Sequence, residues 1–373
     1  MTDSHLRREL FIVAASGCAL SGLFFSSLYL YRDYEPAPQA LLQSLLLWTL
    51  VWQQGWSLRL HNRIDATATL LPTLGNANRL TLLRGWLIAA CGGFLLLPSE
   101  SAGVAPALCY SLAAILDRLD GYVARRSGNV TLLGSELDTR IDAIGLLVAP
   151  LLAVGYGKLH ASYLVVSVAY YLFVGGLHWR RINGKRVLPL RPSRLRRTLA
   201  GMQMGFVAFA LWPQLQPALT QLCGTAFMVP LLFGFVVDWL VVSDRLPSQS
   251  AIAERNFRLV ETTGEVFAKP LLRFALVAAL WFNAGPLQTA PSESIAASFP
   301  LLLISVCLLC GIAGRICAVA ALLLVNVSSG AAAVNSTTEL LAPLLAVWVL
   351  LFGTGRFSAW QADSNWVNRQ DGG

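Results

Sequence analysis

Long uncharged hydrophobic runs alternate with short charged segments along almost the whole chain. Each run favours a membrane-spanning helix, although several are shorter than the roughly 20 apolar residues of a full span and would need flanking polar residues at the interface. The runs cover residues 10–31, 38–56, 80–97, 105–123, 137–155, 161–177, 200–215, 222–242, 271–284, 295–312, 316–334 and 340–352. The pattern predicts an all-α polytopic membrane protein with about twelve transmembrane helices.

Composition and charge agree with this prediction. Of the 373 residues, 55% are hydrophobic and only 13% are charged, whereas a soluble chain carries about 25% charged residues. When the runs are threaded in order, only Arg32 and Lys158 of the 28 Lys and Arg fall in loops opposite the N-terminus. Cytoplasmic loops carry such an excess of basic residues. We therefore expect an integral protein of a bacterial inner membrane, with both termini in the cytoplasm and a first run that is retained rather than cleaved.

The cysteines and the short motifs exclude several other classes of protein. All seven cysteines lie within the predicted spans and show neither a disulfide framework nor the ligand spacing of a zinc site. Cys307 and Cys310 have CxxC spacing, which leaves a redox role open beside simple packing of small apolar residues. The sequence contains no phosphate-binding glycine loop, nucleophile elbow or HExxH motif, and nothing in it points to nucleic acid as a partner.

Four aspartates interrupt two neighbouring hydrophobic runs. Asp117 and Asp120 are three residues apart and Asp138 and Asp142 four apart, so each pair shares one face of its helix. Because the two helices are antiparallel and joined by a short loop, we expect all four carboxylates to converge at the cytoplasmic end. Such a cluster needs cations, and ligation by oxygen alone favours Mg²⁺ or Mn²⁺. Two such ions form a clamp for displacement at phosphorus.

The residues between the aspartates fit the same chemistry. Gly121 follows Asp117 by one helical turn and lets a bulky ligand approach the backbone, and Arg125 lies one turn further, where it can pair with a phosphate. The alternative is that the aspartates pair only with neighbouring arginines at the headgroup level. The candidates for such pairing are Arg118, Arg125, Arg126 and Arg140.

The pattern of residues from Asp117 to Asp142 resembles the signature of the CDP-alcohol phosphotransferase family, Asp-x2-Asp-Gly-x2-Ala-Arg-x8-Gly-x3-Asp-x3-Asp. The fixed positions are filled by Asp117, Asp120, Gly121, Ala124, Arg125, Gly134, Asp138 and Asp142. The resemblance implies a six-helix core over residues 71–244. It also implies transfer of the phosphoryl-bearing group of a CDP-linked donor to an alcohol, with release of CMP. Two metal ions would be held by the four aspartates, and Asp142 would also accept the proton of the attacking hydroxyl.

The resemblance extends to residues that would bind the donor. The stretch "NRLTLLRG", residues 78–85, resembles the Asn-x-x-Thr-x-x-Arg element that lines the family's nucleotide site, which implies donor binding by Asn78 and Thr81. Arg84 belongs either to this element or to a set of membrane anchors. A hydroxyl residue in the loop between the carboxylate helices is common in the family, and Thr131 occupies that place. Gly121 and Arg125 would complete the donor pocket.

A basic stretch, "RPSRLRRTLAGMQMG" at residues 191–205, occupies the place where some branches bind a phosphorylated acceptor. Arg194, Arg196 and Arg197 are therefore candidate acceptor ligands, although the Gly-Lys-x-Lys-Thr spelling expected in the glycerol- and inositol-phosphate branches is not cleanly present. The competing interpretation is a cytoplasmic membrane anchor. The acceptor alcohol accordingly stays open.

We expect the core to be flanked by other parts. These are a two-helix extension over 1–70, a cytoplasmic linker over 245–270, a four-helix membrane region over 271–355 and a polar tail over 356–373. The four-helix region loosely resembles DoxX-type membrane proteins in "CGIAGRICAVAALLLVNV", residues 310–327, and "LLFGTGRFSAW", residues 350–360. We expect it to have a structural or partner-binding role. The N-terminal helix pair could shape lipid access or a homodimer contact.

The favoured function is thus metal-dependent transfer of a phosphatidyl group from CDP-diacylglycerol to an alcohol or phosphorylated alcohol in phospholipid biosynthesis. Transfer of a phospho-alcohol from a CDP-alcohol to diacylglycerol is the alternative within the same family. A cation transporter would need carboxylates along a path through the bilayer, whereas these cluster at one end. A non-catalytic scaffold would be expected to lack at least one aspartate, and all four are present.

Overall fold

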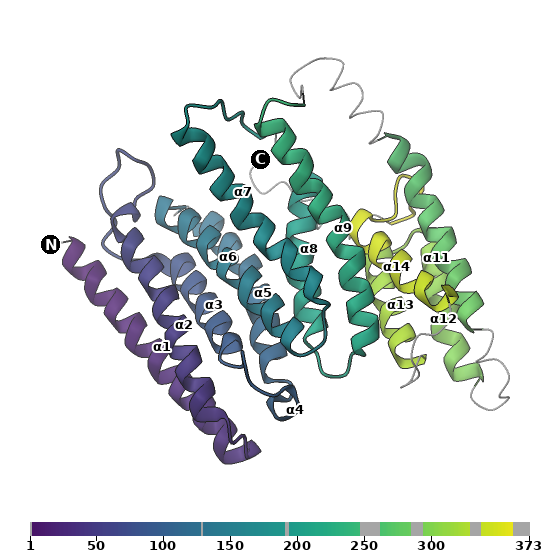
Figure 1. Cartoon of the computed structure of the whole chain (residues 1–373), viewed down its shortest axis with the longest axis horizontal. Helices are drawn as coiled ribbons and strands as arrows, with labels where there is room; N and C mark the ends of the chain where they lie inside the picture. The colour runs from purple at the N-terminus through teal and green to yellow at the C-terminus, as the bar shows by residue number, and fades with distance from the viewer. Residues whose placement is uncertain are drawn as a thin grey trace. The chain divides into compact units, whose positions relative to one another are not determined.

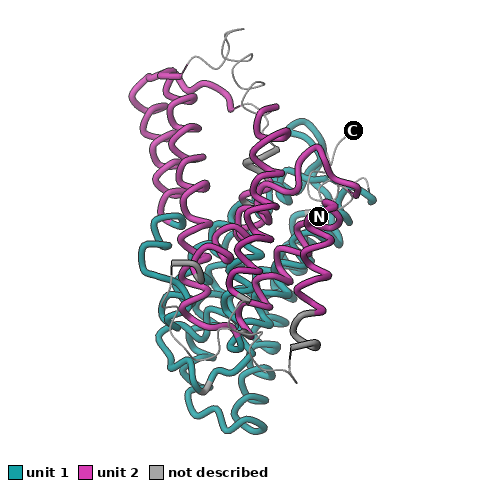
Figure 2. Tube along the Cα trace, turned by 90° about the vertical axis from the view of Figure 1, so that its right-hand side faces the viewer, with its two compact units in different colours: residues 1–167, 204–214 teal, residues 168–203, 215–373 magenta. Residues whose placement is uncertain are grey.

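The computed structural model describes residues 2–127, 130–190, 194–246, 262–284, 294–328 and 337–360. Within these ranges every named element is a helix, and β-pairing is limited to an isolated bridge between Ile312 and Trp360. The predicted all-α class is therefore confirmed. The chain divides into two compact units, which Figure 2 shows in separate colours: residues 1–167 with 204–214, and residues 168–203 with 215–373.

The first unit is built around one central helix. Its elements are α1 (Thr2–Arg32), α2 (Ala37–Leu58), the 3-10 turns η1 (Arg59–His61) and η2 (Ala161–Tyr163), α3 (Gly75–Gly92), α4 (Ser99–Ala102), α5 (Ala105–Ser127) and α6 (Leu132–Gly155). Helix α3 packs against α2, α5 and α6, and α1 packs mainly against α2 (Figure 1). The buried positions of α3 include polar residues as well as Leu82, Ile88 and Ala90. The centre of this unit is therefore partly polar, which is unusual inside an apolar bundle and positions the site described below.

Two tryptophans of α2 connect that helix to α1. The indole N–H of Trp48 donates to the carbonyl of Ala14 at 3.1 Å, and that of Trp52 donates to the carbonyl of Leu10 at 2.9 Å. Gly17 makes room for the Trp48 ring, because a Cβ at this position would lie 2.2 Å from the ring. Close helix packing through a small residue is typical of helices in membranes.

The loop between η1 and α3 is ordered by its own side chains. Asn62 is buried and donates from its amide to the carbonyls of Leu71 at 3.2 Å and Thr73 at 2.8 Å. Asp65 accepts hydrogen bonds from the side chain and backbone of Thr67, and these bonds lower the pKa of the Asp65 carboxyl group. The loop thus delivers the chain to the start of α3 in a fixed conformation.

The second unit contains the remaining helices. They are α7 (Leu164–Ile182) from residue 168 on, the start of α8 (Arg194–Ala210), α9 (Pro217–Val242), the π-helical turn η3 (Gly264–Ala268), α11 (Lys269–Ala284), α12 (Ser294–Cys310), α13 (Gly314–Ser328) and α14 (Thr337–Phe352). Helix α14 packs against α9, α11 and α13, and α12 packs against α11 and α13. The four last helices therefore share one core, and their DoxX-like character stays a prediction.

Among the residues that the structure describes, three helical segments are long and apolar enough to cross a membrane: Asp3–Arg32, Ala161–Ile182 and Pro217–Val242. Helix α1 exposes Leu23 and Leu30, each 70% accessible, as expected for side chains that face lipid. Shorter apolar helices occur at Gly201–Ala210, Phe299–Cys310, Gly314–Val327 and Leu340–Phe352. Membrane association is therefore supported, whereas the predicted number of about twelve spans and the predicted domain boundaries stay predictions.

Candidate functional site

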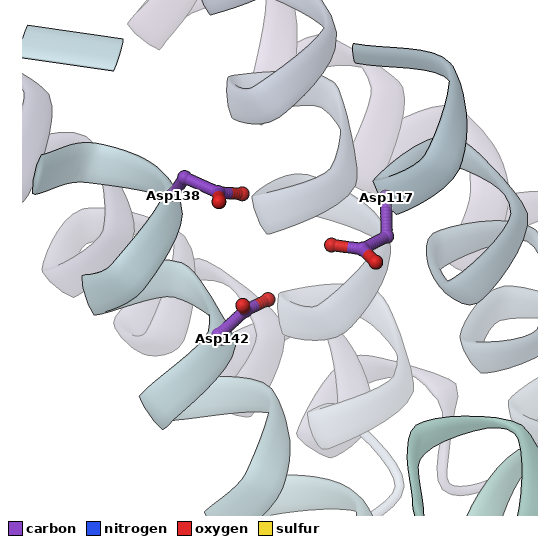
Figure 3. Close-up of side chains that lie close together, drawn as sticks. All are labelled: Asp117, Asp138 and Asp142. Atoms are coloured by element: carbon purple, nitrogen blue, oxygen red, sulfur yellow. The ribbon is translucent and has the colours of Figure 1, made fainter. Parts of the chain in front are cut away.

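Three aspartates from two helices meet at one point (Figure 3). Asp117 comes from α5, and Asp138 and Asp142 come from consecutive turns of α6. One carboxylate oxygen from each lies within 4.8 Å of the other two, so this cluster could hold a metal ion. The side chains of Asp138 and Asp142 are 45% and 40% exposed, which leaves the cluster accessible to a ligand.

Asp120, the fourth aspartate of the motif, is turned toward α3. It is only 5% exposed, and its Oδ2 accepts a hydrogen bond from the hydroxyl of Thr81 at 3.0 Å. Asp120 does not belong to the group of three oxygens that lie within 4.8 Å of one another. The buried Thr81, which the family resemblance assigned to the donor, thus holds the fourth carboxylate of the motif in place.

A single arginine contacts all four aspartates. Arg84 on α3 is fully buried. Its Nη1 contacts the Oδ1 of Asp117 and lies 3.6 Å from Asp120 Oδ2, while its Nη2 lies 2.7 Å from Asp138 Oδ1 and 3.2 Å from Asp142 Oδ1. A fully buried guanidinium cannot reach lipid headgroups. The interpretation of Arg84 as a membrane anchor is therefore wrong, because the tertiary fold surrounds α3 with the carboxylates of α5 and α6.

Charge and hydrogen bonding both leave this cluster incomplete. When all four carboxylates are ionised, they and the one guanidinium carry a formal charge of −3. The buried Oδ1 of Asp142 makes no hydrogen bond within the described part of the chain, despite its ion-pair distance to Arg84. Hard divalent cations prefer such oxygen-only, negatively charged sites. The residues present therefore fit a divalent metal ion.

Asn78 and Thr131 connect the start of α3 to the start of α6. The Thr131 hydroxyl caps α6 by accepting from the backbone N–H of Gly134 at 3.0 Å, and it also accepts from the Asn78 amide at 3.2 Å. The same amide donates to the Leu74 carbonyl at 2.7 Å. A Cβ on Gly134 would lie 2.6 Å from Asn78 Oδ1, which explains why a glycine suits this position of the motif.

A polar pocket of about 260 Å³ opens beside this junction. It is lined by residues 71–77, Arg79, Ser127 and Thr131. Asn78, Thr81 and Arg84 lie along one face of α3, in this order from the pocket side toward the aspartates. The six positions from Asn78 to Arg84 correspond to about 9 Å along the helix. Gly121 and Arg125 lie on α5, where the exposed Arg125 guanidinium approaches the position of a Gly121 Cβ to 3.2 Å.

The candidate acceptor ligands cannot be placed in the same way. Helix α8 begins at Arg194, but the side chains of Arg194, Arg196 and Arg197 lie outside the described residues. Their role stays a prediction.

Glu9 on α1, which no sequence motif singles out, holds two residues that line the pocket. Its Oε2 accepts from the backbone N–H of Leu74 at 2.9 Å and its Oε1 from Nε of Arg79 at 2.7 Å. Glu9 is 65 and 70 residues away from these partners in the chain. An acidic residue at the edge of a hydrophobic run is otherwise read as an interfacial charge, so only the fold reveals this contact.

Comparison with known proteins agrees with the site. The family described as CDP-alcohol phosphatidyltransferase matches residues 74–239, a range that contains all four aspartates, Arg84, Asn78 and Thr131. A curated relative from Methanocaldococcus jannaschii, named CDP-diacylglycerol--serine O-phosphatidyltransferase, is 36% identical over 72 residues. These residues are 19% of this chain and 35% of the relative, so the match spans about a third of the relative's length. No solved structure matches the chain.

The family matched by sequence comparison is the one that the aspartate motif resembles. The match begins at Leu74, in the pocket wall, and ends at Trp239 on α9. Residues 74–239 of this chain thus match the CDP-alcohol phosphatidyltransferase family both in the overall comparison and in the aspartate motif.

Proposed function

We propose that this protein transfers a phosphatidyl group from CDP-diacylglycerol to an alcohol and releases CMP, with the help of divalent metal ions. The observation that carries the proposal is the convergence of Asp117, Asp138 and Asp142 to within 4.8 Å inside the family domain. The unbalanced negative charge of the cluster supports a metal-dependent reaction at a pyrophosphate.

The donor and the acceptor are proposed from different observations. The printed name of the M. jannaschii relative specifies CDP-diacylglycerol as donor and serine as acceptor for that protein. We extend the donor to this chain and take serine as the first acceptor to test. The basic stretch at Arg194, Arg196 and Arg197 makes a phosphorylated alcohol the second. The reverse arrangement, a CDP-alcohol donor with diacylglycerol as acceptor, is distinguished by the experiment below.

In the proposed reaction the acceptor oxygen forms a bond to the phosphatidyl phosphorus, and the bond from that phosphorus to CMP breaks. Asp142 accepts the proton of the hydroxyl. Asp117 and Asp138 would each hold both metal ions, with Asp120 on the first ion and Asp142 on the second. When bound, the ions supply positive charge that polarises the pyrophosphate and stabilises the departing CMP.

The other residues of the site bind and orient the donor. Thr131 lines the pocket and its hydroxyl accepts from the Asn78 amide, which supports donor binding by both residues. Gly121 has no side chain and therefore lets the donor approach the backbone of α5. The exposed Arg125 pairs with a phosphate of the donor. Thr81 acts indirectly, because its hydroxyl donates a hydrogen bond that holds the carboxylate of Asp120 in place.

The cellular setting is part of the proposal. The apolar helices and the distribution of basic residues support an integral membrane enzyme of a bacterial inner membrane. The site would face the cytoplasm, on the same side as both termini, and a homodimer stays a prediction. The C-terminal helices are proposed to support the core or bind a partner.

The test is CMP release by the purified protein in nanodiscs, with CDP-diacylglycerol and Mg²⁺ or Mn²⁺, while acceptors are screened by mass spectrometry of the lipid product. We expect a phosphatidyl-alcohol to form, EDTA to stop its formation and added Mg²⁺ or Mn²⁺ to restore it. Product only from a CDP-alcohol and diacylglycerol would reverse the assignment of donor and acceptor. No CMP with any pair of substrates would contradict the proposed function.

Two variants of α6 make the test specific to the cluster. Asp142→Asn keeps the shape of the side chain but removes the base, so turnover should fall by at least about 100-fold. Glu136→Gln is the matched control, because Glu136 is an exposed acid of the same helix that pairs with His61 and Arg140. It should leave turnover unchanged.

A further inference from the structure

Arg84 lies between the two helices that carry the aspartates and divides its guanidinium evenly between them. Nη1 faces the pair on α5, Asp117 and Asp120, and Nη2 faces the pair on α6, Asp138 and Asp142. Nη2 also lies 3.3 Å from the backbone carbonyl of Asp138. The side chain thus links α3, α5 and α6 at the site itself.

Within the described part of the chain, the guanidinium of Arg84 contacts the four carboxylates and the backbone carbonyl of Asp138. Its Nε is buried and has no hydrogen-bond partner within the described part of the chain. The Arg84 side chain is 0% exposed, so solvent does not replace the missing partner. A buried arginine that served only to pack the core would be expected to satisfy its Nε as well. The placement of Arg84 is therefore explained by the four carboxylates.

Without a cation, the four carboxylates would repel one another. Carboxylates are expensive to bury unless they are paired, and guanidinium is the side chain best suited to several carboxylates because its charge is permanent and its donors form a planar fork. Three of the carboxylates that contact Arg84, those of Asp117, Asp138 and Asp142, also form the group that could hold a metal ion. A divalent ion bound to these carboxylates would compete with the contacts that Arg84 makes to them and would repel its charge.

We infer that Arg84 is a positioning residue that assembles the four aspartates in the metal-free protein and competes with divalent ions for their oxygens. The inference rests on the proposed metal site. It assigns Arg84 two opposite effects: it stabilises the protein before metal binds, and it weakens the binding of metal. A residue that only contacted the donor would have neither effect in the absence of donor.

The test compares Arg84→Gln with wild-type protein in the absence of any donor. Mn²⁺ binding is followed by the electron paramagnetic resonance signal of the free ion, and thermal unfolding is recorded in EDTA and in Mn²⁺. In Arg84→Gln we expect a lower melting temperature in EDTA, Mn²⁺ binding that is tighter by about tenfold or more, and a larger increase of the melting temperature on adding Mn²⁺.

Two further variants control this experiment. Arg140→Gln removes an exposed arginine of α6 that bonds to Gln54 and Ser57, and it should match wild type in every measurement. Arg84→Lys keeps the charge but not the fork, and should change both quantities in the same direction by less. If Arg84→Gln does not fold in EDTA, Arg84→Lys decides the question.

The outcomes separate this inference from the proposed function. Unchanged or weaker Mn²⁺ binding in both Arg84 variants, or an unchanged melting temperature in EDTA, would overturn the inference while leaving the proposed reaction intact. If wild-type protein binds no divalent metal, the metal dependence of the proposed function fails. The melting temperatures in EDTA would still decide whether Arg84 assembles the carboxylates.

Discussion

Glu9 on α1 forms an ion pair with Arg79 on α3, in which both Nε and Nη2 of the arginine lie 2.7 Å from Oε1 of the carboxylate. The other carboxylate oxygen accepts from the backbone N–H of Leu74. Leu74 and Arg79 line the pocket, whereas Glu9 precedes the residues 74–239 matched by the family. The N-terminal helix therefore takes part in shaping the pocket of the family domain.

We predict that Glu9→Gln weakens binding of the nucleotide donor. Removing the charge loosens both Arg79 and the start of α3, so the KM for CDP-diacylglycerol should rise several-fold while kcat changes little. The free energy of unfolding should fall by about 1–3 kcal/mol, as for other charged hydrogen bonds. Steady-state CMP release measures the first effect and denaturation the second.

Asp3→Asn is the control for Glu9→Gln. Asp3 belongs to the same helix and pairs with Arg7 and Arg59, neither of which lines the pocket. Its KM should equal that of wild type. A Glu9→Gln enzyme with reduced kcat and normal KM would show that Glu9 does not act through the donor pocket.

Gly134→Ala should disturb the junction between α3 and α6. The added Cβ would lie 2.6 Å from Asn78 Oδ1 and 3.2 Å from Thr131 Oγ1, so the amide has to move away from the cap. We expect a higher KM for the donor and a loss of about 1–3 kcal/mol in stability. Gly155→Ala on the same helix meets no atom within 4 Å and should be neutral in both assays.

Thr81→Val tests the support of Asp120. The substitution preserves the shape of the side chain but removes the hydroxyl that donates to Asp120 Oδ2. A buried carboxylate that loses a partner destabilises the protein by about 1–3 kcal/mol. We also expect weaker binding of Mn²⁺ because Asp120 loses its fixed orientation, and Thr81→Ser should restore most of it. Equal Mn²⁺ affinity in wild type and Thr81→Val would mean that Asp120 is held by other groups.

Gly17→Ala and Gly22→Ala separate packing from helix propensity on α1. A Cβ on Gly17 would enter the ring of Trp48, which is buried and hydrogen-bonded to Ala14, whereas one on Gly22 meets nothing within 4 Å. Gly17→Ala should therefore lower the free energy of unfolding by about 1–3 kcal/mol. Gly22→Ala should be neutral or slightly stabilising, and unfolding in detergent with increasing denaturant compares the two.

Helical periodicity predicted most of what lies along single helices. The all-α class followed from the hydrophobic runs, and the spacing of Asp117 and Asp120, like that of Asp138 and Asp142, placed each pair on one helix face. The hydrophobic runs did not determine the number of membrane spans. Helix α3 is only 18 residues long and buries Asn78, Thr81 and Arg84, so its composition does not distinguish a lipid-facing helix from one enclosed by others.

The sequence by itself determined the helical, membrane-associated character of the chain and the family that its central part resembles, because both depend on local spacing of residue types. Only the tertiary structure decided that Arg84 joins the four aspartates and that Glu9 reaches the pocket wall. Those contacts join helices separated by tens of residues. The ion pairs between helices depend on how the helices pack. The spacing of residues along one helix does not predict that packing.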